Sequence, residues 1–253
     1  MTAVVSVKDV TVRFGGVTAL EAVSFDVQDG ELLGLIGPNG AGKTTMMRVI
    51  TGVVRPSPGA VSLDGTDVTA SPPHARIRAG LAISQQLVKP FRSMTVVENV
   101  ALALGAEKTA NPLRALISTG RHDKRDDALT FLERVGIADA ADEAPGSLPL
   151  GYLKRLEVAR ALALGPKLLL LDEPLAGLNH GEAHALAETI KDINADGLTM
   201  LLIEHNLGEV ARICPRLVVL DNGRLLAEGA TAEVLAEPAV QEAYLGSKGD
   251  AAA

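Results

Sequence analysis

A glycine-rich segment that could wrap a phosphate group lies early in the chain. It fits the pattern G-x-x-x-x-G-K-[ST] and consists of Gly37, Pro38, Asn39, Gly40, Ala41, Gly42, Lys43, Thr44 and Thr45. Its glycines let backbone N–H groups approach an anion, and a helix beginning near Lys43 would point its positive end at the same anion. Lys43 is expected to reach the β- and γ-phosphates, and Thr44 to offer a hydroxyl to Mg²⁺. The alternative is a glycine-rich turn without a ligand, which the flanking strand and helix patterns disfavour.

Two adjacent carboxylates follow an apolar stretch much later in the chain. Asp172 and Glu173 come directly after Leu168–Leu171. A buried strand of a parallel sheet delivers its last residues to the carboxyl edge of the sheet, where ligands bind. Asp172 is therefore expected to hold Mg²⁺, directly or through water, and Glu173 to polarise an attacking water. The alternative is a strand that simply ends in solvated acids.

Hydrophobic periodicity indicates the elements that would position these groups. Residues 3–36 are typical of strands, and a helical pattern follows at Lys43–Ile50. After residue 165, strands and helices alternate, which favours a mostly parallel sheet covered on both faces. Between about 95 and 164 the apolar spacing is helical, so we predict an α/β core interrupted by a helical lobe. The helices of that lobe are predicted at Met94–Gly105, Arg125–Val135 and Leu153–Leu164.

The composition excludes several classes of protein. The chain has 253 residues, a net charge of −7, and 47% hydrophobic but only 2% aromatic residues. It is too hydrophobic for a disordered chain and lacks the basic balance of a duplex DNA binder. With Cys214 as its single cysteine it has no disulfide framework, which suits a reducing compartment. No apolar run approaches the roughly 20 residues of a spanning helix, and no signal segment is visible, so a cytoplasmic location is expected.

Taken together, residues 37–45 and Asp172-Glu173 resemble the nucleotide-binding subunit of ABC (ATP-binding cassette) transporters. The resemblance covers about residues 5–246. It implies a P-loop ATPase fold with a parallel sheet, an N-terminal antiparallel β subdomain and an inserted helical subdomain. Residues 1–253 would form a single nucleotide-binding domain, with the catalytic core and β subdomain at 1–85 and 165–253 and the helical subdomain at about 90–164. It also implies an enzyme that hydrolyses ATP with the help of Mg²⁺.

Two further positions fit landmarks of that family near its nucleotide. Phe14 stands where the family has an aromatic residue that stacks on adenine, the alternative being a core Phe on an N-terminal strand. Gln86 resembles the glutamine that senses the metal and the attacking water, in a loop that contacts the membrane subunit. Gln85 is a competing candidate for this role, and an ordinary polar loop is the alternative.

Another landmark follows a second buried strand. His205 resembles the histidine that contacts the γ-phosphate, although a lone histidine is usually structural. Leu175–Asn179 occupies the place of the segment that crosses the dimer interface, with Asn where many members have Asp. The resemblance thus implies catalytic roles for Lys43, Gln86, Glu173 and His205, and metal contacts from Thr44, Gln86 and Asp172.

The signature segment departs from the family pattern. Where the family has Leu-Ser-Gly-Gly-Gln, this chain has Leu148, Pro149, Leu150, Gly151 and Tyr152. In the family this segment opens a helix whose N-terminus faces ATP held by the opposite subunit. Pro149 has neither hydroxyl nor N–H to donate to a γ-phosphate, although proline is sterically acceptable near a helix start. We therefore expect a heterodimer with one impaired ATP site; the alternative is that backbone contacts from Gly151 keep both sites active.

Several stretches more narrowly resemble the ATPases of branched-chain amino acid importers, among them Phe14–Leu20, Leu201–Asn206 and Glu242–Gly246. That resemblance implies a second, different ATPase subunit, two membrane permease subunits and an extracytoplasmic solute-binding protein as partners. The chain would then be peripheral on the inner face of the cell membrane. Branched-chain amino acids are the default solute, with other small solutes as alternatives. Lipopolysaccharide-export ATPases are the runner-up, and a soluble ABC factor or a nucleic acid partner is disfavoured by the acidic charge and the single cassette.

Overall fold

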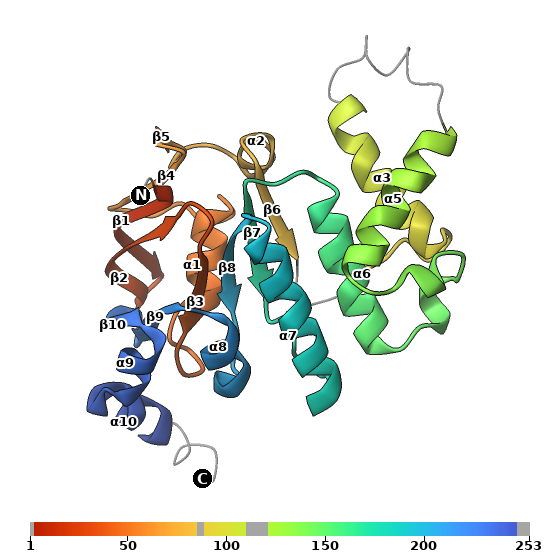
Figure 1. The fold of residues 1–253 in the computed structure, drawn as a ribbon. Helices are drawn as coiled ribbons and strands as arrows, with labels where there is room; N and C mark the ends of the chain where they lie inside the picture. The colour runs from red at the N-terminus through yellow and green to blue at the C-terminus, as the bar shows by residue number, and fades with distance from the viewer. Residues whose placement is uncertain (1–2, 85–88, 110–120, 247–253) are drawn as a thin grey trace.

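In the computed structural model, which describes residues 3–84, 89–109 and 121–246, a six-stranded sheet forms the centre (Figure 1). In spatial order its strands are β10 (Arg224–Ala230), β9 (Arg216–Asp221), β3 (Leu32–Ile36), β8 (Thr199–Ile203), β7 (Leu168–Asp172) and β6 (Leu81–Ser84). Neighbouring strands pair in parallel, except that β10 runs antiparallel to β9.

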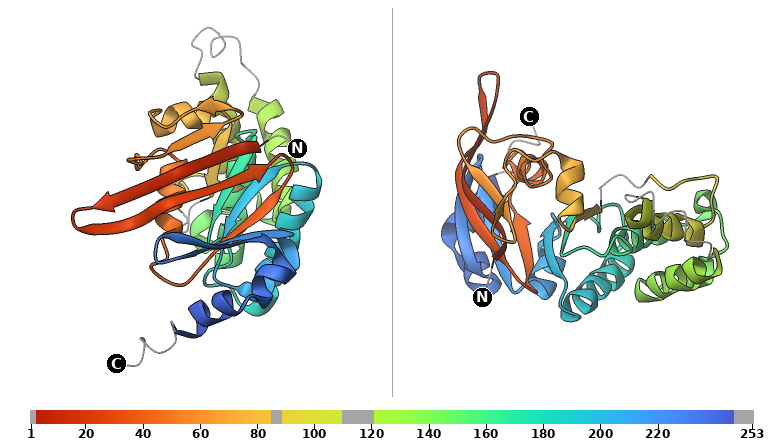
Figure 2. Two further views of the ribbon diagram at one scale, coloured as in Figure 1. Left: turned by 90° about the vertical axis from the view of Figure 1, so that its left-hand side faces the viewer. Right: turned by 90° about the horizontal axis from the view of Figure 1, so that it is seen from above.

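A second, antiparallel sheet is formed by the N-terminal part of the chain. Its spatial order is β2 (Val17–Gln28), β1 (Ala3–Phe14), β4 (Ala60–Leu63) and β5 (Thr66–Asp67). The long hairpin of β1 and β2 extends beyond the neighbouring elements (Figure 2). The predicted α/β fold with an N-terminal antiparallel sheet is confirmed.

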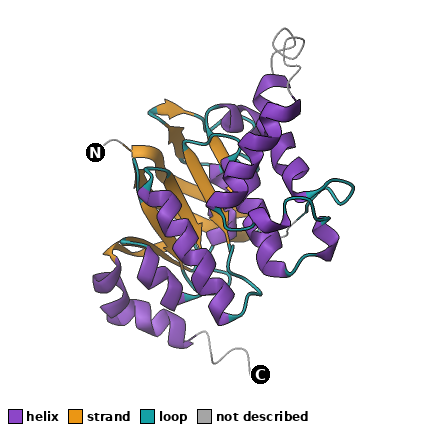
Figure 3. Cartoon of the chain, turned by 45° about the vertical axis from the view of Figure 1, so that its right-hand side comes forward, coloured by secondary structure: helices purple, strands orange, loops and turns teal. Residues whose placement is uncertain are grey.

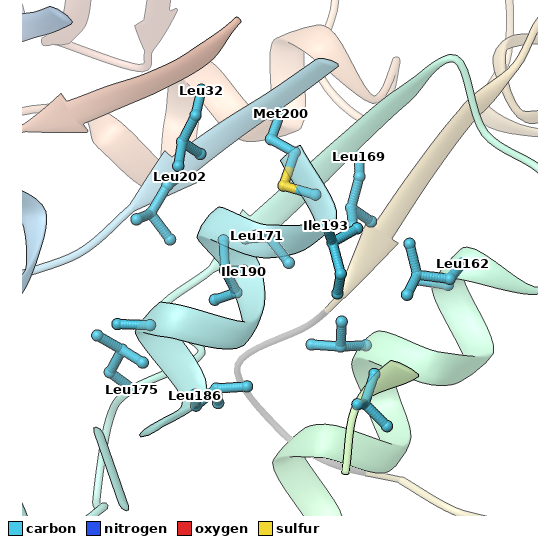
Figure 4. Close-up of a cluster of buried hydrophobic side chains, with 14 of the residues drawn as sticks. Leu32, Leu162, Leu169, Leu171, Leu175, Leu186, Ile190, Ile193, Met200 and Leu202 are labelled. Atoms are coloured by element: carbon cyan, nitrogen blue, oxygen red, sulfur yellow. The ribbon is translucent and has the colours of Figure 1, made fainter. Parts of the chain in front are cut away.

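The side chains of the central strands alternate between two hydrophobic cores, one on each face of the sheet. In β7, Leu169 and Leu171 join one cluster, whereas Leu168 and Leu170 join the other. This division follows from the strand period of two residues, and it explains why the strand is apolar throughout. Figure 4 shows the first cluster between the sheet and α7 (His180–Ala195).

Three helices form a lobe beside the β6 side of the central sheet (Figures 1 and 3). They are α3 (Val96–Thr109), α5 (Arg121–Arg134) and α6 (Leu150–Leu162), and α6 also contacts β6. The predicted start of α6 at Leu153 is wrong by one turn, because Pro149 serves as the N-cap. Its carbonyl accepts from the amides of Tyr152 and Leu153 at 3.1 and 3.2 Å.

Among the remaining described helices, α1 (Lys43–Ile50) packs its apolar side chains into the second core, on the face of the sheet opposite α7. α1 occupies the predicted residues, and α2 (Pro73–Arg78) and α8 (Leu207–Ile213) precede β6 and β9. The structure adds α9 (Thr231–Ala236) and α10 (Pro238–Gly246), which periodicity had not indicated. In the described part of the chain every helix is too short or too polar to cross a bilayer.

A buried arginine caps the C-terminal end of α1. Arg76 of α2 is fully buried, and its Nη1 donates to the carbonyls of Val49 and Ile50 at 2.7 and 2.8 Å. Its other nitrogens donate to the carbonyls of Ser71 and Thr69. Carbonyls in the last turn of a helix have no partner within the helix. A cation at that position fills this role by donating hydrogen bonds to them, and its charge interacts favourably with the negative end of the helix dipole.

The single cysteine is predicted to be chemically inert in the native protein. Cys214 is 2% exposed, and burial raises the pKa of its thiol to about 12. Since the thiolate is the reactive form, Ellman's reagent at pH 8 should react with Cys214 only after denaturant is added. Rapid stoichiometric reaction without denaturant would contradict the packing around this residue.

Candidate nucleotide-binding site

The glycine-rich loop connects the end of β3 to the start of α1. Gly42 is the N-cap of α1 with φ 103°, and Gly37 has φ 149°, both values that favour glycine. A Cβ on Gly37 would lie 2.1 Å from the carbonyl oxygen of Leu220, and one on Gly42 would lie 2.8 Å from that of Ala19. The loop therefore packs directly against the backbone of β9 and β2, and only glycine fits at these two positions.

Lys43 is buried against this loop and stabilises it through hydrogen bonds to the loop backbone. It is 5% exposed, and its Nζ donates to the carbonyls of Gly37 and Pro38 at 2.7 and 2.9 Å. Burial lowers the pKa of Lys43, and the charges of Glu173 and Asp172 oppose that shift. The ammonium group is thus held by the loop backbone and lies within the electrostatic influence of Glu173 and Asp172.

A cavity of about 220 Å³ brings the loop together with residues that are distant in the sequence. Its lining includes Ala19, the loop residues Asn39 to Thr45, Glu173 and His205. Phe14 lies outside this lining, near the tip of the β1–β2 hairpin, with 51% of its surface exposed.

Glu173 and His205 form a pair that faces the loop. Glu173 Oε1 lies 2.6 Å from His205 Nε2, within hydrogen-bond distance. The two residues follow the neighbouring strands β7 and β8, so the sheet itself places them side by side. Glu173 has φ 50°, and left-handed backbone at a residue other than glycine costs about 1–3 kcal/mol and clusters at functional sites.

Asp172 lies at the end of β7 beside a second cavity. Burial, and then the charge of Glu173, raise the pKa of Asp172, while Lys154 lowers it. Asp172 and Thr44 both line this cavity of about 440 Å³, which runs along α1. In the described residues, His, Cys, Asp and Glu side chains nowhere gather in threes that could hold a metal. The hydroxyl and carboxylate instead suit a hard divalent cation that takes its other ligands from phosphates and water.

The altered signature segment opens α6, as expected. Pro149 gives the N-cap no side-chain hydrogen bond, and the Tyr152 hydroxyl turns back to donate to Asp139 at 2.9 Å. Gly151 is buried, and a Cβ placed on it would lie 3.3 Å from Glu182 Oε1 of α7. Asn179, the N-cap of α7, forms a reciprocal capping box with Glu182.

Some site residues were not anticipated, and some predictions lie outside the structure. Gln85 and Gln86 lie outside the described residues. Lys154 and Glu204 contact the site from α6 and from the end of β8, although each looked like an ordinary charged residue in sequence. Burial raises the pKa of Tyr244 to about 12, and a hydrogen bond with the Gly37 backbone opposes the rise, so α10 also reaches the loop. The apolar run Met200–Ile203, which leads directly into Glu204, was the signal available for that residue.

Comparison with known families agrees with this geometry. The family model described as "ABC transporter" matches residues 20–176. A second model, "Branched-chain amino acid ATP-binding cassette transporter", matches residues 224–250, a range that includes α9 and α10.

Curated relatives and solved structures resemble the chain over nearly its whole length. BraF of Pseudomonas aeruginosa, a high-affinity branched-chain amino acid transport ATP-binding protein, is 36% identical over 96% of this chain and 98% of its own. LivG of Salmonella typhimurium, described in the same words, is 37% identical over 95% and 97%. The lipopolysaccharide export system ATP-binding protein LptB of Acidithiobacillus ferridurans is 37% identical over 89% and 90%. An ABC-transporter cassette in its ADP conformation superposes with a TM-score of 0.85 at 32% identity, covering 97% of this chain and 100% of that one. The chain therefore belongs to the ABC transporter family, as one of its ATP-hydrolysing, nucleotide-binding subunits.

Proposed function

We propose that this subunit powers the import of branched-chain amino acids or related small solutes. The observation that carries its ATP-driven part is the Glu173–His205 pair, 2.6 Å apart, in one cavity with the glycine-rich loop. The solute class rests on the similarity to BraF and LivG. BraF and LivG match 96% and 95% of this chain, against 89% for LptB, which supports import over lipopolysaccharide export. Export stays the second candidate, because LptB is similar over 89% of the chain.

The chemistry proposed for the site is phosphoryl transfer to water. The loop amides and Lys43 hold the β- and γ-phosphates, and the α1 dipole adds to their attraction. Glu173 polarises the attacking water, and His205 holds that carboxylate in place and contacts the γ-phosphate. Thr44 and Asp172 would hold Mg²⁺, together with Gln86, and the ion would neutralise charge on the phosphates. The work of the protein is then positioning and charge stabilisation.

Phe14 is proposed as the adenine platform. Its ring is about half exposed on the same hairpin that contributes Ala19 to the cavity beside the loop. An exposed aromatic face can stack on a base without any hydrogen-bond readout.

We assign the permease contact to a groove between β6, α3 and α6. It has a volume of about 270 Å³ and is lined by residues that include Phe91, Leu102 and Arg160. Phe91 and Leu102 are 46% and 45% exposed, and the Arg160 guanidinium lies 5.2 Å from the Phe91 ring centre. Ile83 and Phe91 of the lining flank in sequence the segment with Gln86 that the family resemblance assigns to the membrane subunit, which supports a permease as its occupant.

The signature geometry supports a heterodimer with one impaired site. Pro149 offers no donor, Tyr152 is bonded back to Asp139, and Gly151 is covered by Glu182. In a dimer of this family such a segment would stabilise the partner's ATP poorly. The facing site is therefore proposed to bind ATP and to turn it over slowly.

Replacing Pro149 with Ser should raise ATP turnover of the assembled complex. The new hydroxyl would restore one charge-assisted hydrogen bond worth about 1.5 kcal/mol, or about tenfold at the impaired site. Pro72→Ser is the matched control, since Pro72 is also an extended N-cap without a side-chain bond, at α2. Equal rates for Pro149→Ser and the unaltered complex would rule out the impaired site.

The function is tested by isolating the chain with its natural partners. Affinity purification from detergent-solubilised membranes should recover two permease-type membrane proteins and a second, different ATPase chain. Recovery of this ATPase alone with an export-type membrane pair would favour the lipopolysaccharide-like alternative. Recovery with soluble proteins only would overturn the proposal.

A further inference from the structure

A buried lysine links the signature helix to the proposed catalytic carboxylate of the same chain. Lys154 lies one turn into α6 and is only 4% exposed. Its Nζ donates to the main-chain carbonyl of Glu173 at 3.0 Å. Burying an ammonium is costly unless it is paired, so a lysine kept at this position calls for a specific partner.

The contact acts on a backbone that is under strain. Glu173 has φ 50°, its N–H donates to the Ile203 carbonyl at 2.9 Å, and its carbonyl accepts from Lys154. Its side chain meets His205. The residue is therefore held on both sides of its left-handed Cα, from β8 by Ile203 and from the helical lobe by Lys154.

A buried carboxylate completes the arrangement. Glu204 is 3% exposed, and its two oxygens accept from the amides of Leu175 at 2.6 Å and His205 at 3.1 Å. Burial lowers the pKa of Lys154, and the charges of Glu204, Glu173 and Asp172 oppose this shift. Glu157 of α6 acts in the same sense, so the ammonium lies in the field of four carboxylates at the point where α6, β7 and β8 meet.

We infer that Lys154 is a positioning residue that fixes Glu173 in its catalytic conformation and couples it to the movement of α6. The inference rests on the proposed role of Glu173. Because α6 would carry the signature segment toward the partner's ATP, the same bond would let occupancy of the partner's site alter the water-polarising group of this one. Turnover, rather than nucleotide binding, is what such a bond would control.

The test compares three variants of the full chain, assembled with the subunits that co-purify with it. Lys154→Met removes the donor, Lys154→Arg keeps one, and Arg155→Met removes a neighbouring cation of α6 that instead contacts Val135 and Thr189. Lys154→Met should lower kcat by about 10- to 100-fold, as small misplacements of reacting groups do, with Kd for ATP changed less than threefold. Lys154→Arg should recover most of the rate, and Arg155→Met should keep kcat within about threefold even if its melting temperature falls.

Two results would overturn the inference. One is a normal kcat for folded Lys154→Met, and the other is an equal loss of kcat in Arg155→Met. If Lys154→Met does not fold, Lys154→Gln carries the test, because its neutral donor is one atom shorter and should still depress kcat. A normal rate for Lys154→Gln would then reject the inference. Glu173→Gln separates the two levels. If it hydrolyses ATP normally, the role proposed for Glu173 fails, whereas an inactive Glu173→Gln beside a fully active Lys154→Met rejects the positioning role of Lys154 alone.

Discussion

Glu173→Gln should bind MgATP as tightly as the unaltered chain yet hydrolyse it about 10²–10⁴ times more slowly, the usual contribution of a positioned general base. Glutamine has the same shape and can keep the contact with His205, so the site should stay assembled. It cannot accept a proton from the attacking water. Single-turnover hydrolysis of labelled ATP, with nucleotide affinity measured in parallel, separates the chemical step from binding.

The control for this variant is a carboxylate away from the site. Glu233→Gln alters an exposed residue in the first turn of α9 and should leave both affinity and rate within about twofold. Turnover by Glu173→Gln at the unaltered rate would show that another group polarises the water. Loss of ATP binding would show that Glu173 acts on the ground state instead.

Arg76→Met should destabilise the chain by about 3 kcal/mol or more, since backbone carbonyls buried without a donor cost roughly 1–3 kcal/mol each. Methionine fills a similar volume but cannot donate to the carbonyls of Val49, Ile50, Ser71 and Thr69. The end of α1, the helix that begins at the phosphate loop, would lose its cap. Urea denaturation followed by circular dichroism measures the change in unfolding free energy.

Arg78→Met is the matched control on the same helix. Arg78 is exposed in the last turn of α2, so its loss should change stability by less than about 0.5 kcal/mol. A loss below 1 kcal/mol for Arg76→Met would mean that water or a shifted side chain replaces the arginine. Such a result would contradict the cap assigned to it.

Much of the fold was predictable because its strands are apolar on both faces. The apolar run at Leu168–Leu171, ended by Asp172 and Glu173, predicted a buried strand, and the helix at Lys43–Ile50 followed from the loop pattern. The start of α6 was less accessible, since Pro149 as an N-cap adds a turn that apolar spacing does not mark. The C-terminal helices α9 and α10 are short, so their periodicity is weak.

The residues of the candidate site also fall into those that the sequence could predict and those that it could not. Lys43, Glu173 and His205 could be predicted because motif residues at strand ends of a parallel sheet converge at one edge. Lys154 and Glu204 could not, since their roles depend on main-chain carbonyls and amides that come near only after folding. Sequence patterns report side-chain types, whereas these two residues act on the backbone of others.

The most direct test of the central claim is ATP-driven solute movement by the purified complex in proteoliposomes. The solute-binding protein is supplied on one side of the membrane, and ATP and Mg²⁺ on the other, where this subunit lies. Radiolabelled leucine, isoleucine or valine should then accumulate on the side where this subunit binds ATP. Accumulation should disappear when Glu173→Gln replaces the unaltered chain. Accumulation that persists with Glu173→Gln, or ATP-driven movement of solute or lipid only in the opposite direction, would contradict the account.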